Sequence, residues 1–438
     1  MLKNSFKILG LIFCFNTLNA QDFSLAQATE FALKNHFQSV NAQLDVNKAK
    51  KVIQETRAMG LPQVNGGFDY LNNLKLLFPI NIPAVIPPGQ EFMLMFGAKH
   101  KSTAQVTASQ LVFDGSYIVA LQASKAYLEM YQNQKVKTEA DIKSNIAKAY
   151  YLALVAQENT NIQQKALNNL STSIKETEAM FKEGFVEETD VSQLQLTQLN
   201  LNSSLENAKF QKDIAYQMLK FTMGMDLKSD IKLSDNLQGV ISQINLESLL
   251  TEDFNLNGNP DFVLLNSQAK LLQLDLKRYK MQRLPTIAAF YQGQATAYQV
   301  DFDFYKDAKW LNGHVAGLSI KIPIWSSGMQ AAKIGQAKIE IEKIKNTTNS
   351  VNQGLQVQFT NSKNNLSVKM SGYKNAKKGL ELAEKIQNNT RIKQKEGLAS
   401  SFEASQIDNQ LLSAQGNYIQ SLFDLLNAKS ELDKLQNK

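Results

Sequence analysis

Apolar residues recur at alternating spacings of three and four in two long rows of the chain. One row runs from Val191 to Leu219, and a second row of the same phase lies 213 residues later, from Ala404 to Leu432. The members are mainly apolar: Val191, Leu194, Gln198, Leu201, Leu205, Ala208, Lys212, Ala215 and Leu219, then Ala404, Ile407, Leu411, Ala414, Tyr418, Ser421, Leu425, Ala428 and Leu432. A period of 3.5 residues kept over many turns predicts coiled-coil packing rather than one buried stripe on a globular helix.

The placement of proline predicts that some of these helices are very long. No proline occurs between Pro88 and Pro260 or after Pro323, and proline inside a helix costs about 3 kcal/mol. We expect a first helix at about 23–59 and one continuous helix from Gly115 to Lys182, which would extend about 100 Å. Its counterpart runs from about Met329 to Lys395. A tight turn and a returning helix of about 40 residues follow each long helix.

Four short segments instead alternate with a period of two. They lie at about 62–74, 102–113, 286–297 and 315–325. In the last of them Ala316, Leu318 and Ile320 alternate with Gly317, Ser319 and Lys321, as a strand with one apolar and one wet face requires.

The same order of segments occurs twice, which indicates an internal tandem repeat. We place the first copy at 21–235 and the second at 236–438. Glu183-Gly184-Phe185 reappears as Glu396-Gly397-Leu398, and Leu61-Pro62 matches Leu284-Pro285. The first copy has about 11 extra residues between its strands, which fall in the proline-rich stretch 75–100, where a connecting loop would tolerate them.

Residues 1–20 read as a secretory signal peptide, with Lys3 and Lys7 before a short apolar core. The single cysteine, Cys14, lies in that core, so we expect a mature chain without a disulfide or a thiol site. No later apolar window is long enough for a transmembrane helix. An exported chain of this kind is expected to be periplasmic, secreted, or inserted in an outer membrane as strands.

Composition and charge exclude several classes of function. The chain has 43% apolar and 20% charged residues and a net charge of +7, with scattered basic residues that do not indicate nucleic-acid binding. We find no phosphate loop, nucleophile triad or metal-ligand cluster. We therefore expect no enzyme activity, no cofactor and no metal site. His100 and His314 fall at matching places before the second strand of each copy.

The number of strands bears on assembly. Four strands cannot close a barrel, and open strand edges cannot face lipid. If these strands enter a membrane, several chains must share one barrel, with eight strands from two chains, twelve from three or sixteen from four. The strand count predicts an oligomer and leaves its number open.

The chain resembles the TolC-like outer membrane efflux proteins over essentially all of its mature length. The resemblance rests on the order and spacing of "LPQVNGGFDY" and "LPTIAAFYQG" at the strand starts, "LVFDGS" and "IPIWSSG" at the strand-to-helix junctions, and "EGFVEETDV" and "EGLASSFEA" at the turns. It implies an α+β membrane protein that forms a homotrimer. Each chain would contribute four membrane strands to a twelve-stranded β-barrel, and this barrel would continue as an α-helical coiled-coil barrel. It further implies a passive exit duct in the cell outer membrane that extends into the periplasm and serves tripartite efflux or type I secretion.

The family resemblance also suggests site residues. By motif position, Gly184, Phe185 and Val186 of the first turn would contact a periplasmic adaptor (membrane fusion protein) that works with an inner-membrane pump. Gly397, Leu398 and Ala399 would do so at the second turn. A glycine permits the left-handed turn, and an apolar residue beside it at an exposed tip favours a partner. Packing of Phe185 and Leu398 across their own hairpins is the alternative.

Family members line the pore entrance with acidic residues six positions after the turn glycine, which here are Asp190 and Glu403. A ring of carboxylates would attract cations. The second acidic position of the family is Gln406 here, and ordinary exposed helix charges are the alternative. A periplasmic coiled-coil structural or adaptor protein is the competing function. The pattern does not distinguish export of drugs, metals or proteins.

Overall fold

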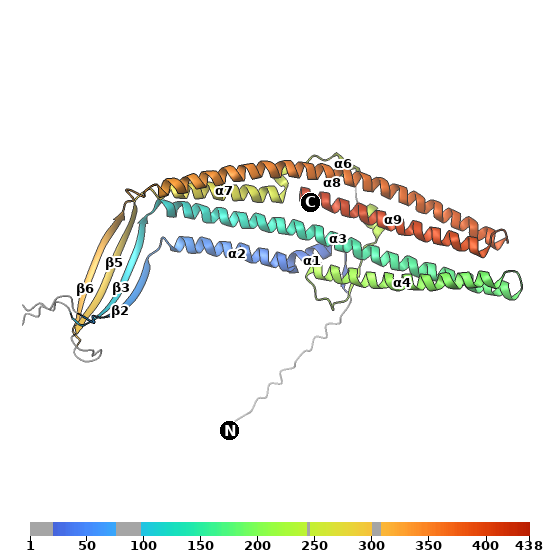
Figure 1. The fold of residues 1–438 in the computed structure, drawn as a ribbon, viewed down its shortest axis with the longest axis horizontal. Coiled ribbons are helices and arrows are strands. Elements are labelled where there is room, and N and C mark those ends of the chain that lie inside the picture. Colours follow the sequence, from blue (N-terminus) through green and yellow to red (C-terminus); the bar gives the residue numbers. More distant parts are fainter. Residues whose placement is uncertain (1–20, 76–97, 243–245, 300–307) are drawn as a thin grey trace, which may run out of the picture. The chain divides into compact units, whose positions relative to one another are not determined.

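The computed structural model describes residues 21–75, 98–242, 246–299 and 308–438. The predicted signal segment and residues 76–97 of the predicted loop lie outside these ranges. The helices are α1 (Leu25–Asn35), α2 (Phe37–Ala58), α3 (Gly115–Lys182), α4 (Glu188–Met223), α5 (Leu237–Ser242), α6 (Leu246–Thr251), α7 (Pro260–Met281), α8 (Met329–Lys395) and α9 (Ser401–Gln436), with a 3-10 turn at Leu256–Gly258. The strands are β1 (Gln21–Phe23), β2 (Gln63–Asn72), β3 (His100–Phe113), β4 (Ile231–Leu233), β5 (Thr286–Gln299) and β6 (Trp310–Lys321). The order helix, two strands, long helix, shorter helix thus occurs twice (Figure 1).

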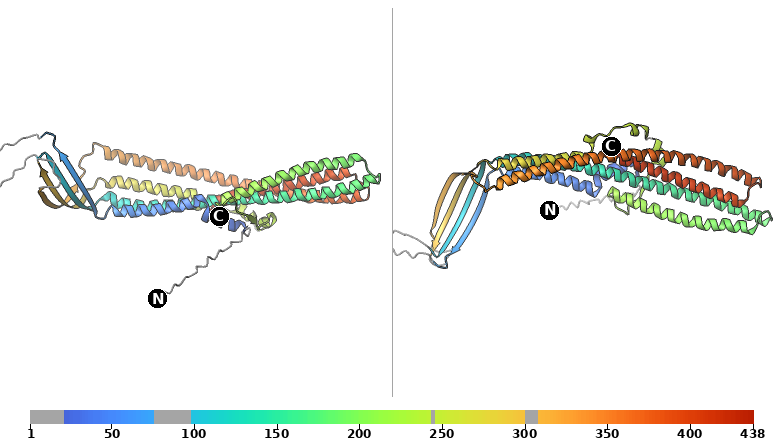
Figure 2. Two further views of the ribbon diagram at one scale, coloured as in Figure 1. Left: turned by 90° about the horizontal axis from the view of Figure 1, so that it is seen from below. Right: turned by 45° about the horizontal axis from the view of Figure 1, so that its top comes forward.

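The chain forms two compact units, each built from segments distant in sequence. The first unit comprises residues up to 43, 134–263 and 350–438, and the second comprises 44–133 and 264–349. The first unit therefore holds α4, α9 and the later parts of α3 and α8, from residues 134 and 350 onward. The second unit holds the larger sheet together with the first parts of α3 and α8 (Figures 1 and 2).

The core of the first unit is formed by the helical hairpins. Buried residues of α3, α4 and α9 pack together with α1, among them Ile146, Leu219 and Leu426, each fully buried. Along the first hairpin, Leu170 and Ile174 of α3 meet Leu194 and Leu201 of α4. The apolar rows predicted from the sequence therefore form the seams between these helices.

A buried tyrosine links the two short strands of the first unit. β1 pairs in parallel with β4, with Phe23 opposite Leu233. The Tyr150 hydroxyl donates to the Phe23 carbonyl oxygen at 2.8 Å and to the Asp235 carboxylate at 3.0 Å. Burial, followed by the neighbouring carboxylate of Asp235, raises the pKa of Tyr150 far above its usual value. The hydroxyl therefore stays a proton donor that holds the start of the described chain in place.

The second unit contains a four-stranded antiparallel sheet in the order β2-β3-β5-β6. Its register separates two faces. The apolar face, as we call it, carries Val64, Phe68, Tyr70, Ala104, Val106, Ala108, Ile287, Ala289, Tyr291, Ala295, Ala297, Trp310, Ala316, Leu318 and Ile320. The polar face carries Gln63, Asn65, Asp69, Lys101, Thr103, Gln105, Thr107, Ser109, Gln292, Gln294, Thr296, Ser319 and Lys321, and it also includes the apolar residues Leu71, Phe290, Tyr298, Leu311 and Val315.

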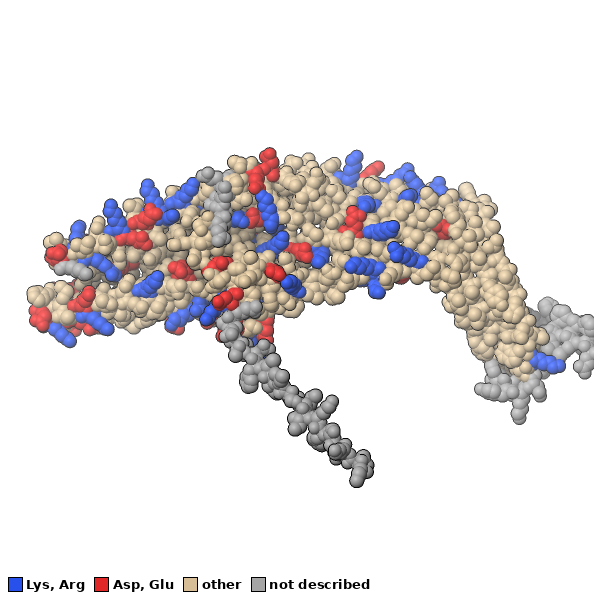
Figure 3. Space-filling view, turned by 180° about the vertical axis from the view of Figure 1, so that it is seen from behind, with Lys and Arg blue, Asp and Glu red and all other residues tan. Residues whose placement is uncertain are grey.

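Charge follows the same division. The acidic and basic residues of these four strands are Asp69, Lys101 and Lys321, and all three lie on the polar face. Apolar-face side chains are nevertheless open to solvent: Val64 and Leu318 are each 68% exposed and Val106 is 53% exposed. On the side shown in Figure 3, both signs of charge are spread over the helices, whereas the surface over the sheet is almost uncharged. An uncharged and exposed apolar face of this kind needs a covering.

Three predicted strands begin and end within two residues of the expected bounds, whereas one strand and one helix differ more. The predicted 315–325 strand is β6 at Trp310–Lys321, because Trp310 to Gly313 continue the pairing with β5 and Pro323 has no N–H for further pairing. The predicted 23–59 helix is divided into α1 and α2 at His36, which is extended with φ −62° and ψ 133°. Among the described helices, none has an apolar stretch sufficient to span a bilayer.

Candidate functional site

The first hairpin turn, after α3, is set by a left-handed glycine. Gly184 has φ +80°. Its N–H donates to the Phe181 carbonyl at 3.0 Å, and the Phe185 N–H donates to the Met180 carbonyl at 2.9 Å. These two bonds form a Schellman motif, which satisfies the last carbonyl groups of the helix and reverses the chain.

The second hairpin turn, after α8, repeats this geometry. Gly397 has φ +72°, its N–H donates to the Gln394 carbonyl at 3.0 Å, and the Leu398 N–H donates to the Lys393 carbonyl at 2.8 Å. A Cβ added at either turn glycine would meet nothing within 4 Å. The left-handed backbone, and not a lack of space, therefore requires glycine at both positions.

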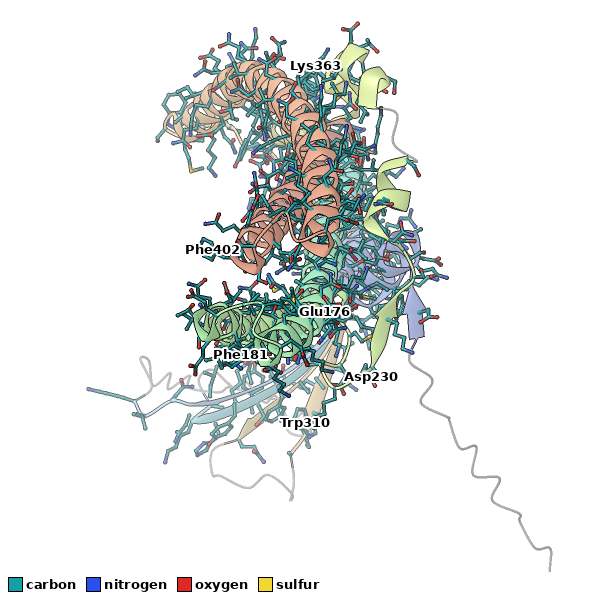
Figure 4. The ribbon with its side chains drawn as sticks, turned by 90° about the vertical axis from the view of Figure 1, so that its right-hand side faces the viewer. Glu176, Phe181, Asp230, Trp310, Lys363 and Phe402 are labelled. Carbon is teal, nitrogen blue, oxygen red and sulfur yellow. The ribbon has the colours of Figure 1, made fainter. Side chains whose placement is uncertain are left out.

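The residues that follow the two glycines border one hollow of about 690 Å³. Phe185 and Val186 come from the first turn, and Gly397, Leu398 and Ala399 from the second. Figure 4 looks onto this end of the hairpins, with Phe181 of α3 and Phe402 of α9 labelled. The structure thus brings five of the six predicted contact residues together, whereas Gly184 is not among the lining residues.

Both apolar tip residues are largely open to solvent. Phe185 and Leu398 are each 76% exposed, although a Schellman motif is often accompanied by packing of this residue against its own helix. At the base of the turns, the buried hydroxyl groups of Thr177 and Ser401 lie 3.3 Å apart and join α3 to α9. The tip therefore presents two exposed apolar side chains on hairpins that contact each other.

The two predicted pore acids each occupy the third position of a returning helix. The Asp190 carboxylate accepts a hydrogen bond from the Glu187 N–H at 3.2 Å. The Glu403 N–H donates to the Ser400 hydroxyl oxygen at 3.1 Å. Carboxylates in the first helical turn favour the helix dipole, so both residues have a local stabilising role. Asp190 is half-buried and borders the hollow, whereas Glu403 is exposed and is not among its lining residues.

The histidines of the sheet have partners that the sequence did not suggest. The Tyr70 hydroxyl lies 2.7 Å from Nδ1 of His100, and the Tyr291 hydroxyl lies 2.9 Å from Nδ1 of His314. Each pair joins neighbouring strands on the apolar face and stacks its rings. The matching histidines were visible in the sequence, but the two tyrosines fall at different offsets in the two copies, 221 residues apart against 223 for Leu61 and Leu284. These bonds satisfy polar atoms on a face that is otherwise mainly apolar.

Comparison with known proteins agrees with this architecture. The outer membrane efflux protein family matches residues 29–225. The resemblance to this family, inferred from the sequence, is confirmed. A comparison with curated proteins finds no match.

Solved structures of outer membrane proteins share the fold over nearly the whole chain. The outer membrane protein VceC of Vibrio cholerae has a TM-score of 0.69 at 14% identity, covering 94% of this chain and 96% of that one. The Campylobacter jejuni outer membrane channel CmeC has a TM-score of 0.71 at 14% identity, with 94% and 85% covered. The open-state outer membrane channel MtrE of Neisseria gonorrhoeae has a TM-score of 0.70 at 14% identity, covering 94% of this chain and 88% of that one.

The two comparisons cover different parts of the candidate site. The family match ends two residues after α4, so it includes the first turn with Phe185 and Asp190. The second turn, with Leu398 and Glu403, lies outside the family match and is covered only by the similarity to the solved structures. Together they place both turns in the fold shared with these outer membrane proteins, and the family match includes the first turn.

Proposed function

We propose that this chain is the outer membrane exit duct of a tripartite efflux or type I secretion system. The observation that carries the proposal is the sheet β2-β3-β5-β6. It has an exposed apolar face, a polar face that holds all its acidic and basic residues, and unpaired edges at β2 and β6. Lipid would cover the apolar face, and the edges of other copies would pair with the open edges, since an open edge cannot face hydrocarbon.

We propose a homotrimer, the assembly that the family resemblance implies, although four copies of this sheet would also give a closed number of strands, sixteen. Three copies give twelve strands around an aqueous passage, whereas two copies give eight strands and an interior that side chains fill. We propose that the halves 21–235 and 236–438 are structural repeats that each contribute two membrane strands. The hairpins would continue the passage as a coiled-coil barrel in the periplasm. The duct would be a passive conduit driven by an inner-membrane pump.

A substitution pair on one strand tests membrane insertion. Val106 lies midway along β3 on the apolar face, and Thr107 beside it lies on the polar face. Arginine facing lipid near the bilayer midplane costs about 2–4 kcal/mol, so Val106→Arg should strongly reduce the heat-resistant oligomer in outer membrane fractions. Thr107→Arg is the matched control and should assemble.

The same fractions distinguish the competing function. If wild-type protein is water-soluble without detergent and both arginine variants behave like it, the chain is a periplasmic coiled-coil protein and the duct proposal is wrong.

We further propose that Phe185, Val186, Leu398 and Ala399, together with the turn glycines, contact a periplasmic adaptor. The exposure of Phe185 and Leu398 on one hollow supports this contact.

Asp190 and Glu403 would form an acidic ring at the pore entrance. Single-channel recording of the purified oligomer tests this ring: Asp190→Asn with Glu403→Gln should lower the cation-to-anion permeability ratio. Unchanged selectivity would assign both acids to helix capping alone.

A further inference from the structure

A basic hollow lies in the second unit, where α7 ends and α8 begins. Its lining residues are Lys280, Arg283, Ala331, Ile334, Gly335 and Lys338, around a volume of about 560 Å³. Arg283 precedes the first residue of β5 by three positions. Lys338 lies about 14 Å from the start of α8, at 1.5 Å per residue. The hollow is therefore close to the end of the sheet.

The three cations of the hollow have no acidic partner among the described residues. Of the nearby acids, Asp275 pairs with Arg278 at 2.6 Å and Glu340 pairs with Lys343 at 2.9 Å. Glu342 lies one turn after Lys338 in α8 and forms no ion pair with it among the described residues. Lys280, Arg283 and Lys338 are exposed, and Ile334 lies half-buried between them. Unpaired cations around an apolar floor fit an anion that carries a hydrocarbon part.

A second feature lies between β6 and the same end of α8. The segment from Ile322 to Trp325 is apolar and outside any strand or helix. Ile324 is 91% exposed and Trp325 is 86% exposed. Tryptophan at the edge of a membrane sheet is typical of the lipid headgroup level, so this segment indicates where the bilayer surface meets the chain.

We propose that this hollow binds the headgroup of an anionic glycerophospholipid, such as phosphatidylglycerol, with Trp325 in the headgroup layer beside it. This inference rests on the proposed membrane insertion of the sheet. Lys280, Arg283 and Lys338 would hold the phosphate, and Ile334 would contact the glycerol and upper acyl carbons. Basic clusters next to a membrane segment attract anionic lipid within about a Debye length.

The two tryptophans of the chain allow the proposal to be tested apart from membrane insertion. Trp310→Phe leaves Trp325 as the reporter at the junction, and Trp325→Phe leaves Trp310 as a reporter on the apolar face of β6. Each full-length variant is reconstituted in phosphatidylcholine vesicles that contain brominated phosphatidylglycerol or brominated phosphatidylcholine, and fluorescence quenching is measured. Trp310 should be quenched by both lipids, and Trp325 more strongly by phosphatidylglycerol.

Removing the three positive charges of the hollow tests whether it causes the preference of Trp325 for phosphatidylglycerol. Lys280→Gln, Arg283→Gln and Lys338→Gln together should lower the preference for phosphatidylglycerol by roughly fivefold per cation. The matched control is Lys374→Gln, Lys377→Gln and Lys378→Gln, three exposed cations in the first unit, which should preserve it. Gly335→Leu fills the floor without changing charge, since nothing lies within 4 Å of its Cβ position, and should also weaken binding.

The outcomes separate the two proposals. Quenching of Trp310 without any lipid preference at Trp325 overturns the lipid site and leaves the duct intact. Trp325 shielded from both lipids means that another copy covers the junction, which also overturns it. Displacement by equimolar inorganic phosphate indicates a site for free phosphate instead. Absence of quenching at Trp310 contradicts the duct itself.

Discussion

The two hairpin turns have the same backbone but start their returning helices differently. Both use a left-handed glycine in a Schellman motif and leave the next apolar residue 76% exposed. Ser400, the residue before α9, accepts a hydrogen bond from the Glu403 N–H through its side chain. Glu187, the residue before α4, donates its N–H to the Asp190 carboxylate. The features that the two turns share, the left-handed glycine and the exposed apolar residue, shape the surface at the tip. The hydrogen bonds that differ between the turns stabilise the starts of α4 and α9.

The two strand-to-helix junctions differ more. After β3, Asp114 directly begins α3: its carboxylate accepts from the Ser116 N–H at 2.7 Å, the Ser116 hydroxyl at 2.6 Å and the Tyr117 N–H at 3.0 Å. After β6, seven residues precede α8, including Ser327 with φ +47° and the exposed Trp325. The two copies therefore have the same order of elements but different junctions: the β3–α3 junction is capped by hydrogen bonds to Asp114, and the β6–α8 junction is an exposed apolar segment.

The largest effect is expected where the two turns agree. Phe185→Asp with Leu398→Asp should abolish export of a pump substrate, because both exposed apolar contacts to the adaptor are replaced by charge. The oligomer should still assemble, since neither side chain is part of the buried core. Substrate efflux from cells and heat-resistant oligomer on gels are the two measurements.

The exchange variant Phe185→Leu with Leu398→Phe is the control for this pair. It preserves apolar character at both turns and should retain most of the export. Export by the double aspartate variant at the wild-type rate would mean that the adaptor does not depend on these residues.

A smaller effect is expected at the capped junction. Burial raises the pKa of Asp114, but hydrogen bonds from Ser116, Tyr117 and Thr286 outweigh this and hold the pKa below the ordinary 3.8. The contribution to stability is therefore present above about pH 4 and is lost as the pH falls through the lower, folded-state pKa. Asp114→Asn should lower stability by about 1–2 kcal/mol at pH 7.

Thermal unfolding in detergent measures this effect. The wild type should lose its advantage over Asp114→Asn as the pH falls below about 4. Ser326→Ala at the other junction is the control, because no side-chain hydrogen bond of Ser326 is found among the described residues, and it should change little. A difference between wild type and Asp114→Asn that is constant with pH would contradict the carboxylate cap.

Local patterns were sufficient to predict the long helices. α3 spans the predicted Gly115–Lys182, because no proline interrupts the helix anywhere along the segment. The turn glycines were also predictable, since a Glu-Gly pair precedes both apolar rows. Five of the six predicted contact residues line one hollow, and Gly184 does not.

What the sequence did not reveal depends on contacts between distant residues. The break between α1 and α2 lies beside Gly224: a Cβ there would come within 2.6 Å of the Asn35 carbonyl oxygen. No local signal at His36 reports that neighbour. The β1–β4 pair likewise depends on residues far apart in sequence, because Tyr150 of α3 and Asp235 hold it in place. Strands of three residues are also too short to show a detectable alternation of apolar and polar residues.

The glycines of the two turns offer a test of their equivalence. Gly184→Ala and Gly397→Ala should each destabilise the turn by about 1–2 kcal/mol, the cost of a left-handed backbone for a residue with a Cβ. Limited proteolysis at the turns should accelerate by a similar factor in both variants. The control is Gly372→Ala, at a helical glycine with open space around its Cβ position, which should be neutral or stabilising. A much larger effect at one turn would show that the hairpins do not have equal roles.

The smallest effect is expected at the helix starts, where the two turns differ. Ser400→Ala removes the side-chain acceptor of the Glu403 N–H and should destabilise the start of α9 by about 1 kcal/mol. Glu187→Ala should cost less at α4, because Asp190 still accepts from the backbone N–H of residue 187. Hydrogen exchange of the amides in the first turn of each helix gives the measurement, with faster exchange expected mainly in α9. Equal acceleration in both helices would mean that Glu187 and Ser400 stabilise their helices equally. The two turns would then differ in residue type but not in the stability of the helix that follows.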